Sequence, residues 1–105
     1  MCETNDDIWL KKNNITDDEF REIDSRNGKC KSIRDIQILL AYGIEFYVTF
    51  RGREYFLSPS PDTYQVMTGR GYYYETDDLD DFGENARIGE KGEFYLKDVI
   101  DELEF

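Results

Sequence analysis

The spacing of hydrophobic residues changes near residue 43, from the period of a helix to the period of a strand. Before that point, apolar residues recur at i, i+3, i+6 and i+7, the pattern of a helix with one buried face. Ser32 is a suitable N-cap with Asp35 at the third helical position, and Gly43 can adopt the left-handed conformation that ends a helix. A core helix is therefore predicted over 33–42, with this buried face: Ile33, Ile36, Leu39 and Leu40.

Residues 44–51 alternate strictly between apolar and polar side chains, which predicts a strand with one buried face. The sequence Arg51-Gly52-Arg53 predicts a tight turn, and residues 54–58 return as the partner strand. Two X-Pro units then interrupt the ladder. The remaining segments are predicted in this order: a loop over 58–62, a strand over 63–68, a turn over 69–71 and a strand over 72–75.

The N-terminal part predicts one short helix. Residues 1–7 are interpreted as a frayed terminus, and residues 8–10 as an apolar patch that forms an edge strand or packs on the core. Thr16 followed by Glu19 is a capping-box pattern, which predicts a helix over 17–25.

The C-terminal third predicts an acidic helix and a closing helix. Thr76 can cap a helix over 77–82 that Gly83 closes, and a polar loop follows over 84–92. The last helix is predicted over 94–103, because apolar residues again recur at i, i+3, i+4 and i+7: Leu96, Val99, Ile100 and Leu103. Together these elements predict an α+β fold: one domain over 1–105, an antiparallel three- to four-stranded meander with helices packed on one face.

The charge of the chain is strongly negative and unevenly distributed. The 105 residues carry 24 acids and 13 bases, for a formal charge of −11. Residues 75–105 alone contribute twelve acids and three bases, whereas residues 26–53 are mildly basic, with six bases and two acids. Such a charge repels nucleic acid and anionic membranes and attracts basic partners, so we expect no direct nucleic-acid binding.

Several classes of chemistry lack their usual residues. Histidine is absent, and the two cysteines, Cys2 and Cys30, are too few for a disulfide framework or a zinc site. No apolar run reaches the roughly 20 residues of a membrane span, and no signal-peptide hydrophobic region follows Met1. We therefore expect a soluble, cytoplasmic protein that is not an enzyme and has no cofactor.

Three possible catalytic or metal sites each have a simpler explanation. Asp78, Asp80 and Gly83 suggest a calcium loop, but its fifth position would be Phe82 and its twelfth Gly89. The many acids form chance pairs without the cleft that acid–base catalysis needs. Cys30 between Lys29 and Lys31 could be a nucleophile, but no histidine is present as a base, which favours an ordinary free cysteine.

Tyrosines lie directly before the densest acidic run. Tyrosine is favoured in interfaces, although aromatic residues are also common in strands, and an acidic run is most often a solubilising face. Clustered carboxylates beside aromatic residues can instead occupy a basic groove that evolved for phosphates. The candidate partner-binding residues are Tyr72, Tyr73, Tyr74, Glu75, Asp77, Asp78, Asp80, Asp81 and Glu84. Whether the contact is made by this acidic segment or by the basic region 26–53 stays open at this point.

Three stretches carry a resemblance to known proteins: a helix and glycine followed by Glu45-Phe46, the hairpin Gly52-Arg53-Glu54-Tyr55, and the tail 88–103. In these the chain resembles small uncharacterised α+β proteins of Gram-positive bacteria and their mobile elements, over roughly residues 32–105. In size and acidity it is similar to phage anti-defence proteins, including anti-CRISPR proteins that mimic DNA. These resemblances imply a fold and a manner of binding. They do not identify any binding residue in this chain.

The resulting functional hypothesis is a non-enzymatic inhibitor from a phage or mobile element, acting in the host cytoplasm. It would bind a basic nucleic-acid-handling protein, such as a CRISPR effector nuclease, and block its DNA site. Two alternatives stay open: an immunity protein that neutralises a basic toxin, and a small housekeeping domain.

Overall fold

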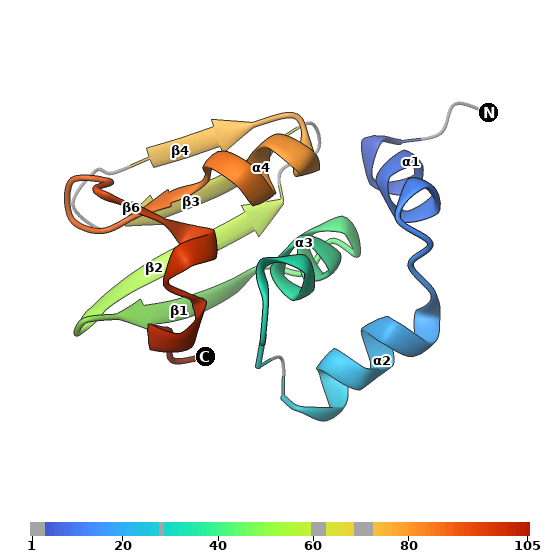
Figure 1. Cartoon of the computed structure of the whole chain (residues 1–105), viewed down its shortest axis with the longest axis horizontal. Coiled ribbons are helices and arrows are strands. Elements are labelled where there is room, and N and C mark those ends of the chain that lie inside the picture. Colours follow the sequence, from blue (N-terminus) through green and yellow to red (C-terminus); the bar gives the residue numbers. More distant parts are fainter. Residues whose placement is uncertain (1–3, 28, 60–62, 69–72) are drawn as a thin grey trace.

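The computed structural model describes residues 4–27, 29–59, 63–68 and 73–105, which form one globule of radius of gyration 13.1 Å. Its centre is a four-stranded antiparallel sheet in the order β1-β2-β3-β4, which confirms the predicted meander and the α+β class (Figure 1). No helix of the described residues combines the length and the apolar character needed to cross a membrane. The elements are α1 (Asn5–Lys12), α2 (Asp17–Ser25), α3 (Ile33–Ala41), β1 (Phe46–Phe50), β2 (Arg53–Pro59), β3 (Tyr64–Thr68), β4 (Tyr73–Thr76), α4 (Leu79–Asn85), β5 (Arg87–Ile88), β6 (Phe94–Tyr95) and the 3-10 helices η1 (Leu96–Asp98) and η2 (Ile100–Glu102).

The sheet buries one face under the helices. Alternate strand residues on that face are buried, and α3 and α4 pack against them (Figure 1). The opposite face carries Tyr47 beside Phe56, with ring centroids 4.7 Å apart, and Tyr47 is 58% exposed. The helix-covered face of the sheet consists mainly of Val48, Phe50, Tyr55, Leu57, Tyr64 and Val66.

The β1–β2 hairpin has the two-residue turn that the sequence predicts. Arg51 and Gly52 both have positive φ angles, 51° and 81°, as in a type I′ turn, and Phe50 pairs with Arg53 across it. β2 continues to Pro59, which pairs with Tyr64, so the strand is longer than the predicted 54–58.

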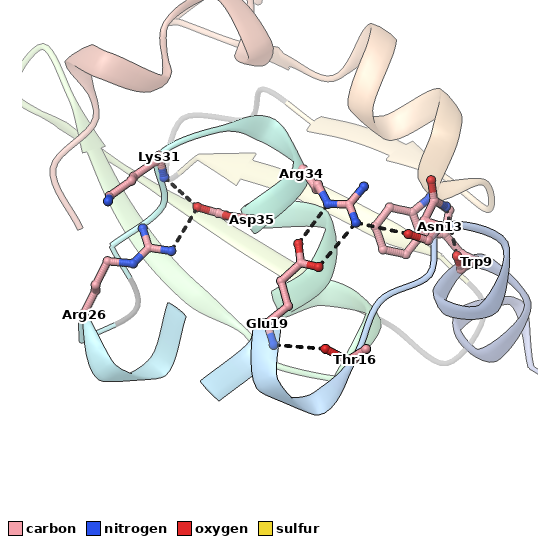
Figure 2. A network of polar contacts seen from close by, with 8 residues as sticks. All are labelled: Trp9, Asn13, Thr16, Glu19, Arg26, Lys31, Arg34 and Asp35. Carbon is pink, nitrogen blue, oxygen red and sulfur yellow. Dashed lines mark hydrogen bonds and ion pairs between the residues drawn. The ribbon is translucent and has the colours of Figure 1, made fainter. Parts of the chain in front are cut away.

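Helices α2 and α3 form as predicted, with one change at the start of α3. Thr16 caps α2 through its side chain, whereas the Ser32 side chain makes no capping bond. Asp35 instead accepts the backbone N–H of Lys31 at 2.8 Å and pairs with Arg26 at 3.4 Å (Figure 2). The Asp35 carboxylate thus anchors the segment before α3, and the predicted serine cap does not form.

The predicted frayed terminus is wrong for residues 4–7, and so is the edge-strand alternative for residues 8–10. Residues 5–12 form α1 instead of a frayed end and an edge strand, because Thr4 caps the helix by accepting the N–H of Asp7. The alternative that the apolar patch packs on the core is confirmed for Trp9, which is buried.

The predicted C-terminal helix over 94–103 is also wrong. All four residues of its apolar stripe are buried, but the backbone forms β6 and two 3-10 helices. The loop predicted over 84–92 contains β5, which pairs with β6. The chain then straightens at Leu103 so that Glu104 can pair with Thr49.

Candidate protein-binding surface

Helix α4 places most of the predicted acidic residues and begins later than predicted. Asp78, rather than Thr76, is the N-cap and accepts the backbone N–H of Asp80 at 2.8 Å. The helix runs through Gly83 to Asn85, so the prediction that Gly83 closes it is wrong. Its inner side is held by the buried Leu79 and Phe82 and by Gln37, whose Nε2 donates to the Leu79 carbonyl at 2.6 Å.

Helix α1 lies against the start of α4. The indole Nε1 of Trp9 donates to Oδ1 of Asp80 at 3.1 Å, and Lys12 forms an ion pair with the other carboxylate oxygen. The Lys12 bond is the main cause that lowers the pKa of Asp80, and the same bond raises the pKa of Lys12. Asp80 therefore joins the N-terminal helix to α4 across 71 residues of sequence.

A polar network holds α1 and α2 in this position (Figure 2). Arg34 on α3 donates from Nε to Glu19 on α2 at 2.9 Å and from Nη2 to the carbonyl of Asn13 at 3.1 Å. The Asn13 side chain in turn donates to the carbonyl of Trp9 at 2.9 Å. The backbone of α1 at Trp9 is thus positioned from α3.

Asp6 belongs to the same surface, although it was not among the predicted site residues. It accepts a hydrogen bond from the hydroxyl of Tyr64, and burial raises its pKa. The pKa of Tyr64 is raised first by burial, then by the bond to Asp6, and further by the charge of Asp78. Asp6 is therefore tied to β3, and its tyrosine partner lies within the electrostatic influence of Asp78. The only sequence feature that could have indicated a helix at Asp6 is Thr4 as an N-cap followed by acids in the first turn.

A shallow hollow of about 370 Å³ lies between these two helices. We call its acidic residues and the adjoining Asp6 the acidic face: Asp6, Asp77, Asp78 and Asp80. Lys12 is the one base among the described residues that line the hollow, and Ile8, 50% exposed, forms an apolar part of its wall.

The other predicted residues do not join this face. Tyr74 points to the helix side of the sheet, where its hydroxyl donates to Asp81 at 2.6 Å and its ring packs edge-on against Phe82. That bond is the first cause that lowers the pKa of Asp81. Tyr74 is therefore a structural residue, not an exposed anchor.

Glu75 and Glu84 each contact residues outside the acidic face. Glu75 accepts hydrogen bonds from Thr63 and from its cross-strand neighbour Gln65, both at 2.8 Å. Glu84 pairs with Lys97 at 2.9 Å. Tyr73 begins β4, and Tyr72 lies outside the described residues.

In the basic region 26–53 the arginines are paired within the protein, whereas the two lysines, Lys29 and Lys31, are exposed. Its four arginines, Arg26, Arg34, Arg51 and Arg53, form ion pairs with Asp35, Glu19, Glu102 and Glu90. Guanidinium groups used in this way add little attraction for an acidic partner.

No catalytic or metal constellation stands out in the part of the chain that the structure describes. It contains no group of three or more histidine, cysteine, aspartate or glutamate side chains placed to hold a metal ion. Cys30 is buried, and burial is the main reason that its pKa rises to about 12, which disfavours the nucleophilic thiolate.

Comparisons with known proteins give no relative. No protein-family model matches the chain, and neither the curated proteins nor the solved structures include a significant match. The functional argument therefore rests on the geometry of this chain alone.

Proposed function

We propose that the protein acts by binding, as a non-enzymatic inhibitor of a basic nucleic-acid-handling protein. The observation that carries the proposal is a hollow between α1 and the start of α4 that three carboxylates line, those of Asp77, Asp78 and Asp80, with Lys12 as the base among its lining residues. Asp6 on α1 adds a fourth carboxylate nearby, bonded to Tyr64. Lysine and arginine side chains of a DNA-binding groove pair with carboxylates as they do with phosphate oxygens. A CRISPR effector nuclease is one enzyme with such a groove, and a phage or mobile element is the source that fits this role.

The arrangement favours binding over catalysis for a physical reason. The carboxylates lie on an open surface, and Asp80 is held by Trp9 and Lys12 in a fixed orientation. Fixed charges on a rigid surface steer a basic partner and lose little conformational freedom when it binds. The apolar wall at Ile8 adds contact area that charge alone does not supply.

The proposal is tested by capturing partners with the tagged protein and measuring association kinetics with the captured basic protein. The quadruple variant Asp6→Asn, Asp77→Asn, Asp78→Ser and Asp80→Asn keeps the α4 cap and the acceptor for Trp9 while it removes four charges. Association should slow by at least about tenfold at low salt, and less at high salt, because screening acts over about 10 Å at 0.1 M.

The matched control removes four exposed acids elsewhere: Glu22→Gln, Glu54→Gln, Asp98→Asn and Asp101→Asn. The control should associate nearly as fast as wild type. Equal losses in both variants would show that net charge alone attracts the partner and would overturn the acidic face. Capture of a cognate toxin would replace the inhibitor role with an immunity role.

A further inference from the structure

A row of apolar residues crosses all four strands of the sheet on the face opposite α3 and α4 (Figure 1). Tyr47 on β1 pairs with Phe56 on β2, which pairs with Met67 on β3. The backbone of Tyr73 on β4 pairs with Met67 and gives the row its fourth position. Cross-strand partners share one face of a sheet, and the two faces alternate along each strand. Leu57, which follows Phe56, is fully buried on the helix side, so this apolar row lies on the outer face.

The apolar row is open to solvent. Tyr47 is 58% exposed, the most of any large hydrophobic residue in the described part of the chain. Its ring lies 4.7 Å from that of Phe56, and both Phe56 and Met67 are partly exposed. Single exposed apolar residues are common on proteins, but a contiguous apolar patch bordered by polar residues is typical of an interaction site.

Acidic residues flank the apolar row on both sides. Toward the β1–β2 turn, the next outward position on β2 is Glu54, which pairs with Thr49. On the other side, Glu75 is the next outward position on β4, and Glu45 precedes Tyr47 by two residues. All three glutamates are exposed, and no outward position that the structure describes on β1–β4 carries lysine or arginine. Charge complementarity therefore favours a partner with bases on both sides of an apolar stripe.

The dimensions of the apolar row match a helix. Neighbouring strands are about 4.8 Å apart, so four strands give a row about 14 Å long, and the next outward residues lie about 7 Å to either side. A helix with apolar residues at i, i+4, i+7 and i+11 presents a stripe about 16 Å long, with further side chains along both of its flanks. An extended segment directs a single line of side chains at a surface and leaves both acidic flanks unpaired.

A second copy of this chain fits the outer face poorly. If two outer faces stacked on each other, the glutamates that flank one apolar row would meet those of the other. The outward positions described on β1–β4 supply no base to pair with them. Like charges brought together in this way oppose association.

We propose that the outer face of the sheet is a docking site for a basic amphipathic helix of another protein. The helix lies across the strands, with its apolar stripe on Tyr47, Phe56 and Met67. Lysine or arginine residues on its two flanks pair with Glu54 on one side and with Glu45 and Glu75 on the other. The inference does not rest on the proposed function, because the acidic face belongs to α1 and α4 on the helix side of the sheet.

The test uses an acetylated and amidated peptide, Ala-Ala-Ala-Leu-Lys-Ala-Lys-Leu-Ala-Ala-Leu-Lys-Ala-Lys-Leu-Ala, titrated into the 15N-labelled protein. As a helix it carries one leucine stripe with lysines on both flanks. Amide shifts should concentrate on β1, β2 and β3, and peptide helicity should rise in far-UV circular dichroism. Added salt should weaken the binding.

Two control peptides keep the same charge. The first, Ala-Lys-Ala-Leu-Ala-Lys-Ala-Leu-Lys-Ala-Leu-Ala-Lys-Ala-Leu-Ala, places the lysines opposite the leucine stripe, and the second has alanine for each leucine. Each should bind at least about fivefold more weakly, because each lacks one component of the contact.

Three protein variants complete the test. Tyr47→Thr with Met67→Thr keeps good strand formers and should weaken binding by at least about fivefold. Glu45→Gln, Glu54→Gln and Glu75→Gln together should do the same and reduce the salt dependence. The matched control, Glu22→Gln with Asp98→Asn and Asp101→Asn, removes three exposed acids elsewhere and should bind within about twofold of wild type. Wild-type-like spectra of the variants exclude misfolding.

Three results would overturn the docking site. Equal binding of all three peptides, or equal losses in the two acid variants, would show that cations are attracted by net charge alone. Absence of binding, or shifts confined to the acidic face, would also overturn it and leave the proposed function intact. Concentration-dependent dimerisation that Tyr47→Thr with Met67→Thr abolishes would replace the helix by a second copy.

Discussion

Replacing Gly83 by alanine should destabilise the wild-type protein but stabilise a variant in which Gln37 is already alanine. Gly83 lies inside α4, where alanine is normally more favourable than glycine by about 0.8–1 kcal/mol. In this protein an added Cβ would meet Nε2 of Gln37 and lie 2.9 Å from its amide carbon. Gln37 is buried and donates to the Leu79 carbonyl, so it cannot move without losing that bond.

The expected magnitude follows from these two opposing effects. Displacing Gln37 leaves a buried amide donor without its partner, at a cost of about 1–3 kcal/mol, and a forced rotamer adds about 0.5–1.5 kcal/mol. After the gain in helix propensity is subtracted, Gly83→Ala should destabilise the protein by about 1–3 kcal/mol. In the Gln37→Ala background the obstruction is gone, and the same change should stabilise by up to about 1 kcal/mol.

The measurement is a double-mutant cycle in which urea denaturation is monitored by far-UV circular dichroism. Unchanged m-values in all four proteins would establish that the midpoints report stability. If Gly83→Ala has the same sign in both backgrounds, the contact between α4 and Gln37 does not restrict this position, and the packing of α4 on α3 described above is wrong.

Two further predictions concern the same core. Leu40 is fully buried on α3, so Leu40→Ala should lower the free energy of unfolding by about 2–5 kcal/mol, and a melt within a degree or two of wild type would contradict the core assignment. The pKa of Asp81 is lowered in the fold from 3.8, chiefly by the hydroxyl of Tyr74, so its contribution is present above that value and is lost as the pH falls through the lower folded pKa. The stability difference between wild type and Asp81→Asn should therefore shrink below about pH 4 in acid titrations of the unfolding midpoint, and a constant difference would refute this.

The parts of the fold that were predictable depend on neighbours in sequence. The strict alternation of 44–51 and the Arg51-Gly52 turn encode the β1–β2 hairpin, and the spacing of the α3 stripe encodes its buried face. Periodicity alone could not determine the secondary structure of the C-terminal residues 94–103. The stripe from Leu96 to Leu103 is buried as expected, but 3-10 helices also repeat every three residues, and the pairing of Glu104 with Thr49 requires an extended end.

The candidate site was less predictable because long-range contacts build it. Sequence adjacency grouped Tyr74, Glu75 and Asp81, but the pleat of β4 directs the first two to opposite faces of the sheet. Asp6 reaches the acidic face only through Tyr64, 58 residues away. No local pattern reports which helix N-termini meet in space.

The bond between Trp9 and Asp80 also has a consequence for the order of events during synthesis. The two residues are 71 positions apart, and ribosomes add about 5–20 residues per second, so α1 exists for about 4–14 s before its partner is made. During that interval the indole N–H lacks its acceptor on α4, whereas α3, which also packs against α1, is already synthesised. The contact between α1 and α4 is therefore completed late on a nascent chain, and until then the Trp9 indole is available to chaperones that recognise exposed aromatic side chains.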